Sequence, residues 1–286
     1  MGIPADVRCA FLFSEDNLPE NSSLMEVLMY PEWNLTNRKN MFAEALSAGE
    51  VFPATGIWMS VKYNFIGGRW SLSRSGRVCG ISDPFTGETV AMIPDSSRED
   101  ALAAVEAARA SFDGSGLWHE GPAQLRAELF EQAAKLMKTY RFELSRLDRT
   151  GTGKKPSDSL EDIDQAIFIF RTLAKDLLSG EECSIPAAAG VCALITPEKC
   201  PLLLSVQLLA PLLAAGNSVV LKPESRTPLA IIFLFELLER AGFPAGSVNL
   251  VLGADAAPES ILRNSLNVDR LICSEKEEAQ SFAAVS

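Results

Sequence analysis

The chain has few of the residues from which metal sites and catalytic triads are built. It contains one histidine, His119, and its six cysteines include no Cys-x-x-Cys pair. A zinc site needs several closely spaced Cys or His ligands, and a hydrolytic triad needs a histidine beside its nucleophile. His119 stands in a glycine-containing loop pattern. We therefore expect an ordinary loop residue there, and we assign no metal ligand and no catalytic residue.

Positive charge and uninterrupted apolar runs are also scarce. The 26 Lys and Arg are outnumbered by 37 Asp and Glu, which gives a formal net charge of −11. An acidic surface repels phosphate backbones and anionic lipids, which argues against nucleic acid or a membrane surface as partner. The most apolar stretch, Pro201–Leu221, is interrupted by Gln207, Pro211 and Gly216-Asn217, whereas a membrane span needs about 20 consecutive apolar residues. Because no basic leader is evident, we expect a cytoplasmic protein, with an organellar matrix as the alternative.

Short and long apolar segments alternate in the second half of the chain. The short ones are rich in Val, Ile and Leu without polar alternation, which is typical of strands covered on both faces. The long ones have helical length and end in glycine-containing stop signals. The order is Gly190–Ile195, Leu202–Ala215, Ser218–Leu221, Leu229–Arg240 and Val248–Leu252. Strand–helix alternation of this kind predicts an α/β fold with a parallel sheet.

Upstream, the pattern predicts a small hairpin region followed by helices. Gly67-Gly68 is placed to centre a hairpin, and Ser96 or Ser97 to cap a helix that runs to about Phe112. The other predicted elements are strands Val78–Asp83 and Thr89–Ile93 and helices Ala123–Thr139, Arg141–Arg149 and Ser159–Leu178. The stretch Gly151–Pro156 lacks the spacing of a phosphate loop and follows a helical pattern, so it predicts a turn between helices.

Residues 1–62 carry no motif. They combine acidic and polar residues with two short helical patterns, Ser23–Tyr30 and Asn37–Ala48. We predict an N-terminal extension over residues 1–62 that packs on the body, with a partner-binding arm as the alternative. Residues 63–286 are predicted to form one domain. Cys192 and Cys273, which lie inside apolar runs, are expected to be reduced and buried.

Several motifs occur together and in order along residues 63–286. They are Phe65–Trp70, Asp83–Glu88, the Ala-rich helix, Gly153–Pro156, Ile195–Pro197, Ala214–Pro223, Thr227–Leu229, Gly242–Pro244, Gly246–Asn249 and Gly253. This series resembles the N-terminal half of the aldehyde dehydrogenase superfamily. The resemblance implies a Rossmann-like, doubly wound parallel sheet with N-terminal helices and a small β-hairpin region, in which a dinucleotide lies across the strand ends without a GxGxxG loop.

The resemblance also implies a cofactor site. Lys222, in the family's Lys-Pro motif, would bind the adenosine ribose, and Thr196 and Pro197 would lie at the same site. A Glu usually shares the ribose, but this chain has Ser225 there. A carboxylate repels a 2′-phosphate, so Ser225 beside Arg226 favours NADP over NAD if either is bound.

Three departures from the family pattern argue against catalysis. Lys199 stands where the family has the Asn that stabilises the oxyanion, and Glu275 stands where it has a glycine close to the pyrophosphate. Lys276 could offset the negative charge of Glu275, but not the space that is lost with the glycine. The family's nucleophilic Cys and general-base Glu both belong to the half that would follow this one. Cys200, beside the oxyanion position, is the one cysteine that we single out for testing.

We therefore predict a catalytically inactive aldehyde dehydrogenase-like protein that acts as a structural, regulatory or assembly subunit. Its protein partner would occupy the surface that the catalytic half normally covers. We expect no bound cofactor, with NADP or NAD as the alternative. The segment Gly180–Gly190 is too short for the family's subunit-associating hairpin, so the usual dimer or tetramer is not predicted. The alternatives are an NAD(P)-dependent aldehyde dehydrogenase whose catalytic half is elsewhere, and an NADP-binding sensor.

Overall fold

The computed structural model describes residues 60–114, 118–179 and 187–273. Their centre is a six-stranded sheet in the order β3-β2-β8-β7-β6-β9. Strands β8, β7, β6 and β9 run parallel, and β2 pairs in antiparallel orientation with both β8 and β3. The strands are β2 (Asn64–Ile66), β3 (Arg69–Ser71), β6 (Val191–Thr196), β7 (Ser218–Pro223), β8 (Val248–Leu250) and β9 (Arg270–Cys273). The predicted α/β fold with a Rossmann-like sheet covered on both faces is thereby confirmed.

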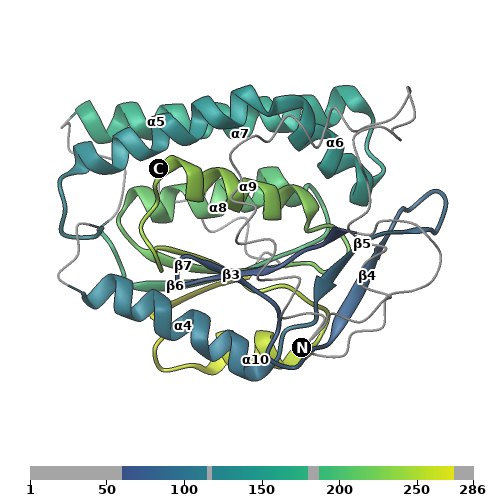
Figure 1. Ribbon diagram of the computed structural model, residues 1–286. Coiled ribbons are helices and arrows are strands. Elements are labelled where there is room, and N and C mark those ends of the chain that lie inside the picture. The colour runs from purple at the N-terminus through teal and green to yellow at the C-terminus, as the bar shows by residue number, and fades with distance from the viewer. Residues whose placement is uncertain (1–59, 115–117, 180–186, 274–286) are drawn as a thin grey trace, which may run out of the picture. The chain divides into compact units, whose positions relative to one another are not determined.

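Helices cover the sheet in layers (Figure 1). Helices α4 (Arg98–Asp113) and α10 (Ala256–Asn264) lie on one face, and α8 (Pro201–Ala214) and α9 (Leu229–Ala241) lie on the other. A further layer of α5 (Ala123–Thr139), α6 (Arg141–Thr152) and α7 (Pro156–Ser179) packs over α8 and α9. This extra layer explains why α8 and α9 are apolar on nearly every side: they are buried between the sheet and other helices.

Successive side chains of a strand point to opposite faces of the sheet, and both faces are apolar here. Val219 and Leu221 of β7 belong to the core beneath α8 and α9. Val220, between them, belongs to the core beneath α4 and α10. All six residues of β7 are buried, which is why its sequence shows no polar alternation.

A second sheet, of three strands in the order β1-β5-β4, lies beside the first. Its strands are β1 (Ser60–Val61), β4 (Val78–Ser82) and β5 (Thr89–Pro94). Ser97 begins α4 as its N-cap, and its backbone N–H donates to the Asp100 carboxylate at 2.8 Å. The predicted cap, hairpin and strand pair are all present, with ends that differ by a few residues.

The structure corrects some element boundaries. Gly151 was predicted to begin a turn, but α6 continues through Thr152 and ends at Gly153, whose φ of 67° suits a glycine. Gly151 packs closely there, because a Cβ would lie 3.1 Å from the Thr227 Cα. Cys192 is buried as expected, whereas Cys273 is half-buried on the edge strand β9. The predicted helices Ser23–Tyr30 and Asn37–Ala48 lie outside the described residues.

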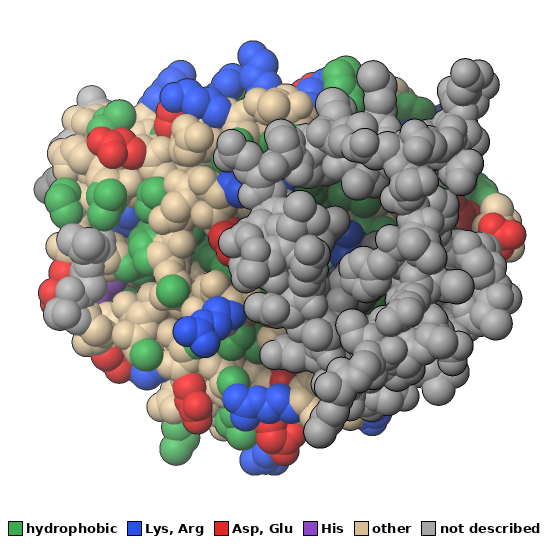
Figure 2. All heavy atoms as spheres, in the orientation of Figure 1, with side chains coloured by type: hydrophobic (Ala, Val, Ile, Leu, Met, Phe, Trp, Pro, Cys, Tyr) green, Lys and Arg blue, Asp and Glu red, His purple; other side chains and the backbone are tan. Residues whose placement is uncertain are grey.

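No helix in the described part of the chain is both long and apolar enough to cross a bilayer. In the view of Figure 2, Lys and Arg side chains lie along the upper margin, over the outer helix layer. Charged side chains of both signs are mixed along the lower margin, over α4 and α10. The described part of this face therefore carries charges of both signs.

Candidate functional site

The carboxyl ends of β6 and β7 form the edge at which open α/β sheets bind ligands. The two strands are parallel and in register, with Ile195 opposite Lys222 and Thr196 opposite Pro223. Beyond them, the Glu224 N–H donates to the Thr196 carbonyl at 3.0 Å. This bond extends the ladder by one step and fixes where the two strand-end loops begin.

Lys222 is a buried cation at this edge. It lies two residues after Val220, so it points to the α4 and α10 face. Its side chain interacts electrostatically with Asp255, at the start of α10, and with Cys79 on β4. Lys222 is 7% exposed, and within the described part of the chain no acceptor lies within hydrogen-bonding distance of its ammonium. An ammonium without a protein acceptor at this edge is a ready donor to hydroxyl groups of a ligand.

The Thr196 side chain is not part of the same surface. It points to the opposite face of the sheet, where its Oγ1 accepts a hydrogen bond of 3.2 Å from Ser205 on α8. Thr196 is 3% exposed. Pro197, the next residue, is half-buried at the edge itself. Of the four residues predicted to bind cofactor, the structure thus separates the Thr196 side chain from Lys222.

Ser225 follows the end of β7 and forms hydrogen bonds with the side chain of the preceding residue, Glu224. Its backbone N–H and its hydroxyl both donate to Oε1 of Glu224, each at 3.0 Å. The Glu224 carboxylate is therefore held against the backbone of its own loop. The Ser225 oxygen can still accept a hydrogen bond from a ligand.

Arg226 forms an ion pair with Glu198 across the two strand ends. Glu198 belongs to the loop after β6, and Arg226 belongs to the loop after β7. Their side chains are 47% and 71% exposed. The sequence predicts Arg226 as a cation for a 2′-phosphate and does not predict its ion pair with Glu198. The opposite charges at the ends of two adjacent predicted strands were the available signal.

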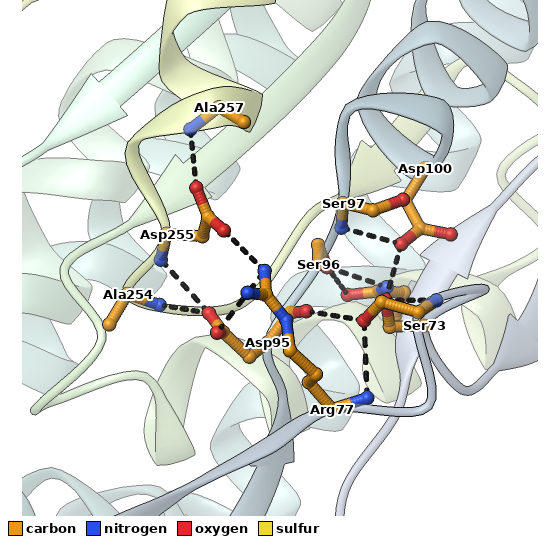
Figure 3. Close-up of polar contacts among 11 residues, drawn as sticks. Ser73, Arg77, Asp95, Ser96, Ser97, Asp100, Ala254, Asp255 and Ala257 are labelled. Atoms are coloured by element: carbon orange, nitrogen blue, oxygen red, sulfur yellow. Dashed lines mark hydrogen bonds and ion pairs between the residues drawn. The ribbon is translucent and has the colours of Figure 1, made fainter.

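A second polar cluster (Figure 3) includes Asp255, which interacts electrostatically with Lys222, and the sequence does not predict it. Asp95, after β5, accepts backbone hydrogen bonds of 2.9 Å from Ala254 and Asp255. Arg77 lies between the carboxylates of Asp95, at 3.6 Å, and Asp255. The cluster attaches the small sheet to the turn between β8 and α10. Its two halves, Arg77 with Asp95 and Ala254 with Asp255, are more than 150 residues apart in sequence, so no local pattern reveals it.

Asp255 is a negatively charged carboxylate in this cluster. Its Oδ1 accepts a hydrogen bond of 2.7 Å from the Ala257 N–H, which caps α10. That bond and the Arg77 guanidinium hold the pKa of Asp255 below its usual range. Asp255 therefore remains a carboxylate, and it balances the charge of nearby Lys222.

The oxyanion region of the predicted family carries Lys199 and Cys200. Lys199 is exposed. Cys200 is the N-cap of α8 with φ 49° and ψ 53°, a left-handed conformation rare outside glycine. It makes no side-chain capping bond, and the Lys154 ammonium lies within electrostatic range of its thiol. Glu275 and Lys276, predicted near the pyrophosphate, lie outside the described residues.

The environments of Cys192, Cys79 and His119 point to structural rather than catalytic roles. Burial raises the pKa of the Cys192 thiol to about 11 and also raises the pKa of the Cys79 thiol. His119 Nδ1 lies 3.1 Å from the Phe112 carbonyl, and its ring stacks on Phe112. Across the ranges that the structure describes, no group of three His, Cys, Asp or Glu side chains could hold a metal ion.

Comparison with known proteins gives consistent matches. A family model described as "Aldehyde dehydrogenase family" matches residues 70–272. Betaine aldehyde dehydrogenase of Bacillus subtilis is 36% identical over 217 residues, which cover 72% of this chain and 44% of that protein. Human retinal dehydrogenase 2 is 29% identical over 243 residues, which cover 80% of this chain and 47% of that protein. The chain thus spans about half the length of the curated relatives that it matches.

Solved structures match in the same way. A crystal structure of betaine aldehyde dehydrogenase from Staphylococcus aureus in complex with NAD+ superposes with a TM-score of 0.69 at 32% identity. The match covers 74% of this chain and 44% of that one. An apo crystal structure of a point mutant of that protein gives the same TM-score and identity.

Proposed function

Because the chain belongs to the aldehyde dehydrogenase family, we propose that its sheet binds the adenosine half of NAD or NADP in a structural or regulatory role. The observation that carries this proposal is Lys222. A family relationship supplies the ligand class, and a buried ammonium at the end of a parallel strand supplies a donor for ribose hydroxyls. The relative whose crystal structure contains NAD+ shares the sheet in which Lys222 lies.

The described residues fit this half of a dinucleotide. Lys222 would hold the ribose, the Ser225 oxygen would accept from a ribose hydroxyl, and Pro197 would border the site. The β6 and β7 backbone keeps these groups at one edge of the sheet. Bound NAD or NADP would supply a hydride acceptor.

A non-catalytic role is supported by the residues at the oxyanion position. Lys199 is an exposed, flexible point charge, whereas oxyanion stabilisation works through pre-aimed donors. Cys200 is followed by Pro201 at the start of α8, and no described imidazole lies beside it. A cysteine nucleophile is commonly paired with a general base such as histidine. The partner in the subunit role would be another protein.

Titration of the full chain with NADH and NADPH, followed by cofactor fluorescence, tests the binding proposal. We expect saturable binding, and we expect Lys222→Gln to weaken it by roughly ten- to a hundredfold, the effect of one charge-assisted hydrogen bond. Lys135→Gln removes an exposed cation on α5 and should bind normally. Circular dichroism of both variants establishes that they are folded. A Lys222→Gln variant that is folded and binds as tightly as wild type would refute the proposal.

Aldehyde oxidation is the second candidate, favoured by the activity named for the similar proteins. It predicts aldehyde-dependent formation of NADH or NADPH by the purified chain, abolished by Cys200→Ser. Under the structural or regulatory proposal, the same assay shows no cofactor reduction at concentrations where cofactor binding saturates. Turnover that Cys200→Ser abolishes would overturn the non-catalytic role and leave the binding proposal intact.

A further inference from the structure

We infer that Glu198 reduces the preference of the site for NADP over NAD by holding Arg226 away from the 2′ position of the adenosine ribose. This inference rests on the proposed binding of a dinucleotide at Lys222. It assigns a specificity role to an acidic residue on a neighbouring strand end. The sequence alone predicted the opposite tendency, an Arg226 available to a 2′-phosphate.

The ion pair lies at the edge where the ribose would bind. Ile195 and Lys222 are paired in register, so residues that follow them by a few positions leave adjacent, parallel strands side by side. Glu198 is three residues beyond Ile195, and Arg226 is four beyond Lys222. The Arg226–Glu198 contact therefore crosses from β7 towards β6. It ties the guanidinium to the loop that follows the neighbouring strand.

Few other groups at the end of β7 distinguish the two cofactors. NADP differs from NAD by a phosphate on the ribose 2′ oxygen, so its selective recognition needs a cation or donors near that oxygen. In the loop after β7, residues 224–228, the one cation is Arg226. The Glu224 carboxylate is held by the Ser225 N–H and hydroxyl. Lys222 would contact the ribose in both cofactors, and it is the same in wild type and in variants of Glu198 and Arg226, so it does not contribute to differences between them.

The exposure of the pair makes its effect moderate and measurable. Arg226 and Glu198 are 71% and 47% exposed at their side chains, and exposed ion pairs are weak and screened by salt. A phosphate dianion can form a bidentate contact with a guanidinium and so compete with one carboxylate. Glu198 therefore lowers the affinity for NADP without preventing its binding. Removing its charge should raise that affinity by about fivefold, the upper range for an exposed pair.

The test compares dissociation constants of NADPH and NADH for wild type, Glu198→Gln, Arg226→Gln and the double variant. In Glu198→Gln, we expect NADPH to bind about fivefold more tightly and NADH to change less than about twofold. The gain should vanish in the double variant, because it depends on the released guanidinium. It should also shrink as salt is raised from low to physiological concentration. Glu143→Gln, which breaks the exposed Arg146–Glu143 pair on α6, matches the charge change away from the site.

The outcomes separate this inference from the proposed function. If wild type and all variants bind neither cofactor, the proposed function fails. If both cofactors bind and Glu198→Gln tightens them equally, Glu198 acts on groups that the cofactors share, and the specificity role is wrong. It is also wrong if the ratio of the two constants is unchanged, or if the gain persists in the double variant.

Discussion

Thr196 and Lys222 end neighbouring parallel strands, yet their side chains point to opposite faces of the sheet. In the register of β6 and β7, Lys222 lies opposite Ile195, and Thr196 lies opposite Pro223. The one-residue offset places Thr196 against Ser205 of α8 and Lys222 towards Asp255 of α10. Because side chains alternate along a strand, a motif that contains functional residues on two strands does not by itself place them on one surface.

The turn that faces Lys222 depends on Gly253. Its φ is 116°, and a Cβ there would lie 2.7 Å from the Ser96 nitrogen. We expect Gly253→Ala to lower the free energy of unfolding by about 3 kcal/mol, because the left-handed backbone strain and the clash add. Gly87→Ala is the matched control, since Gly87 has a φ of 72° and open space around its Cα. It should lose only about 1 kcal/mol. Urea unfolding of both variants measures the difference, and equal losses would contradict the role of the close approach.

The sequence predicted the fold well where the evidence is local or periodic. The apolar runs of β6 and β7 and the helices between them follow from burial on both faces, and Ser97 and Gly242 mark helix ends through their side-chain and backbone chemistry. Gly151 misled the boundary of α6, because its close tertiary approach to Thr227 favours a glycine inside a helix. A breaker residue and a packing residue look the same in one sequence.

The candidate site was only partly predictable. Lys222 was found through the family motif, but the Arg226–Glu198 pair and the Arg77–Asp255 pair join segments 28 and 178 residues apart. Opposite charges at neighbouring strand ends hint at the first pair, but whether either pair forms depends on how the loops leave the strands. The electrostatic environment of Lys222 therefore required the structure.

Asp95 attaches the small sheet to the turn before α10. Its carboxylate accepts two backbone N–H bonds, from Ala254 and Asp255, and its side chain is 18% exposed. Asp95→Ala should destabilise the protein by about 1 kcal/mol, because it removes the acceptor of one part-buried and one exposed backbone donor. Asp95→Asn keeps an oxygen at the same position and should lose less than about half as much. The comparison uses urea unfolding, and similar losses for the two variants would assign the effect to charge rather than to the backbone bonds.

Cys192 gives the protein a dependence of stability on alkaline pH. Burial raises the pKa of its thiol from 9.0 to about 11. Between these values the unfolded state has lost the proton and the native state keeps it. The stabilising contribution is therefore complete below pH 9 and is lost as pH rises towards 11, by up to about 2 kcal/mol. Cys192→Ala has no thiol to titrate, so its stability lacks this dependence on pH. The difference in unfolding free energy between wild type and variant should therefore shrink as pH rises from 9 towards 11. A constant difference between pH 8 and pH 10.5 would contradict the shift.

Arg126 is a buried cation whose partners are carbonyl groups. Its guanidinium donates to the carbonyls of Ala214, Trp118 and Gly121 at 3.0, 2.9 and 3.2 Å. Ala214 ends α8, so the cation also lies where the negative end of that helix stabilises it. Burial lowers the pKa of Arg126, which shows that desolvation opposes the charge.

Replacing the Arg126 guanidinium should lower the free energy of unfolding. Arg126→Met fills the space but leaves buried carbonyls without donors, and we expect a loss of about 3 kcal/mol in the free energy of unfolding. Arg126→Lys retains the charge but cannot reach three carbonyls in one plane, so it should recover only part of that loss. Lys138→Met, an exposed position on the same helix, should change stability by less than about 0.5 kcal/mol. If Arg126→Lys is as stable as wild type under urea unfolding, charge at the end of α8 matters and the guanidinium geometry does not.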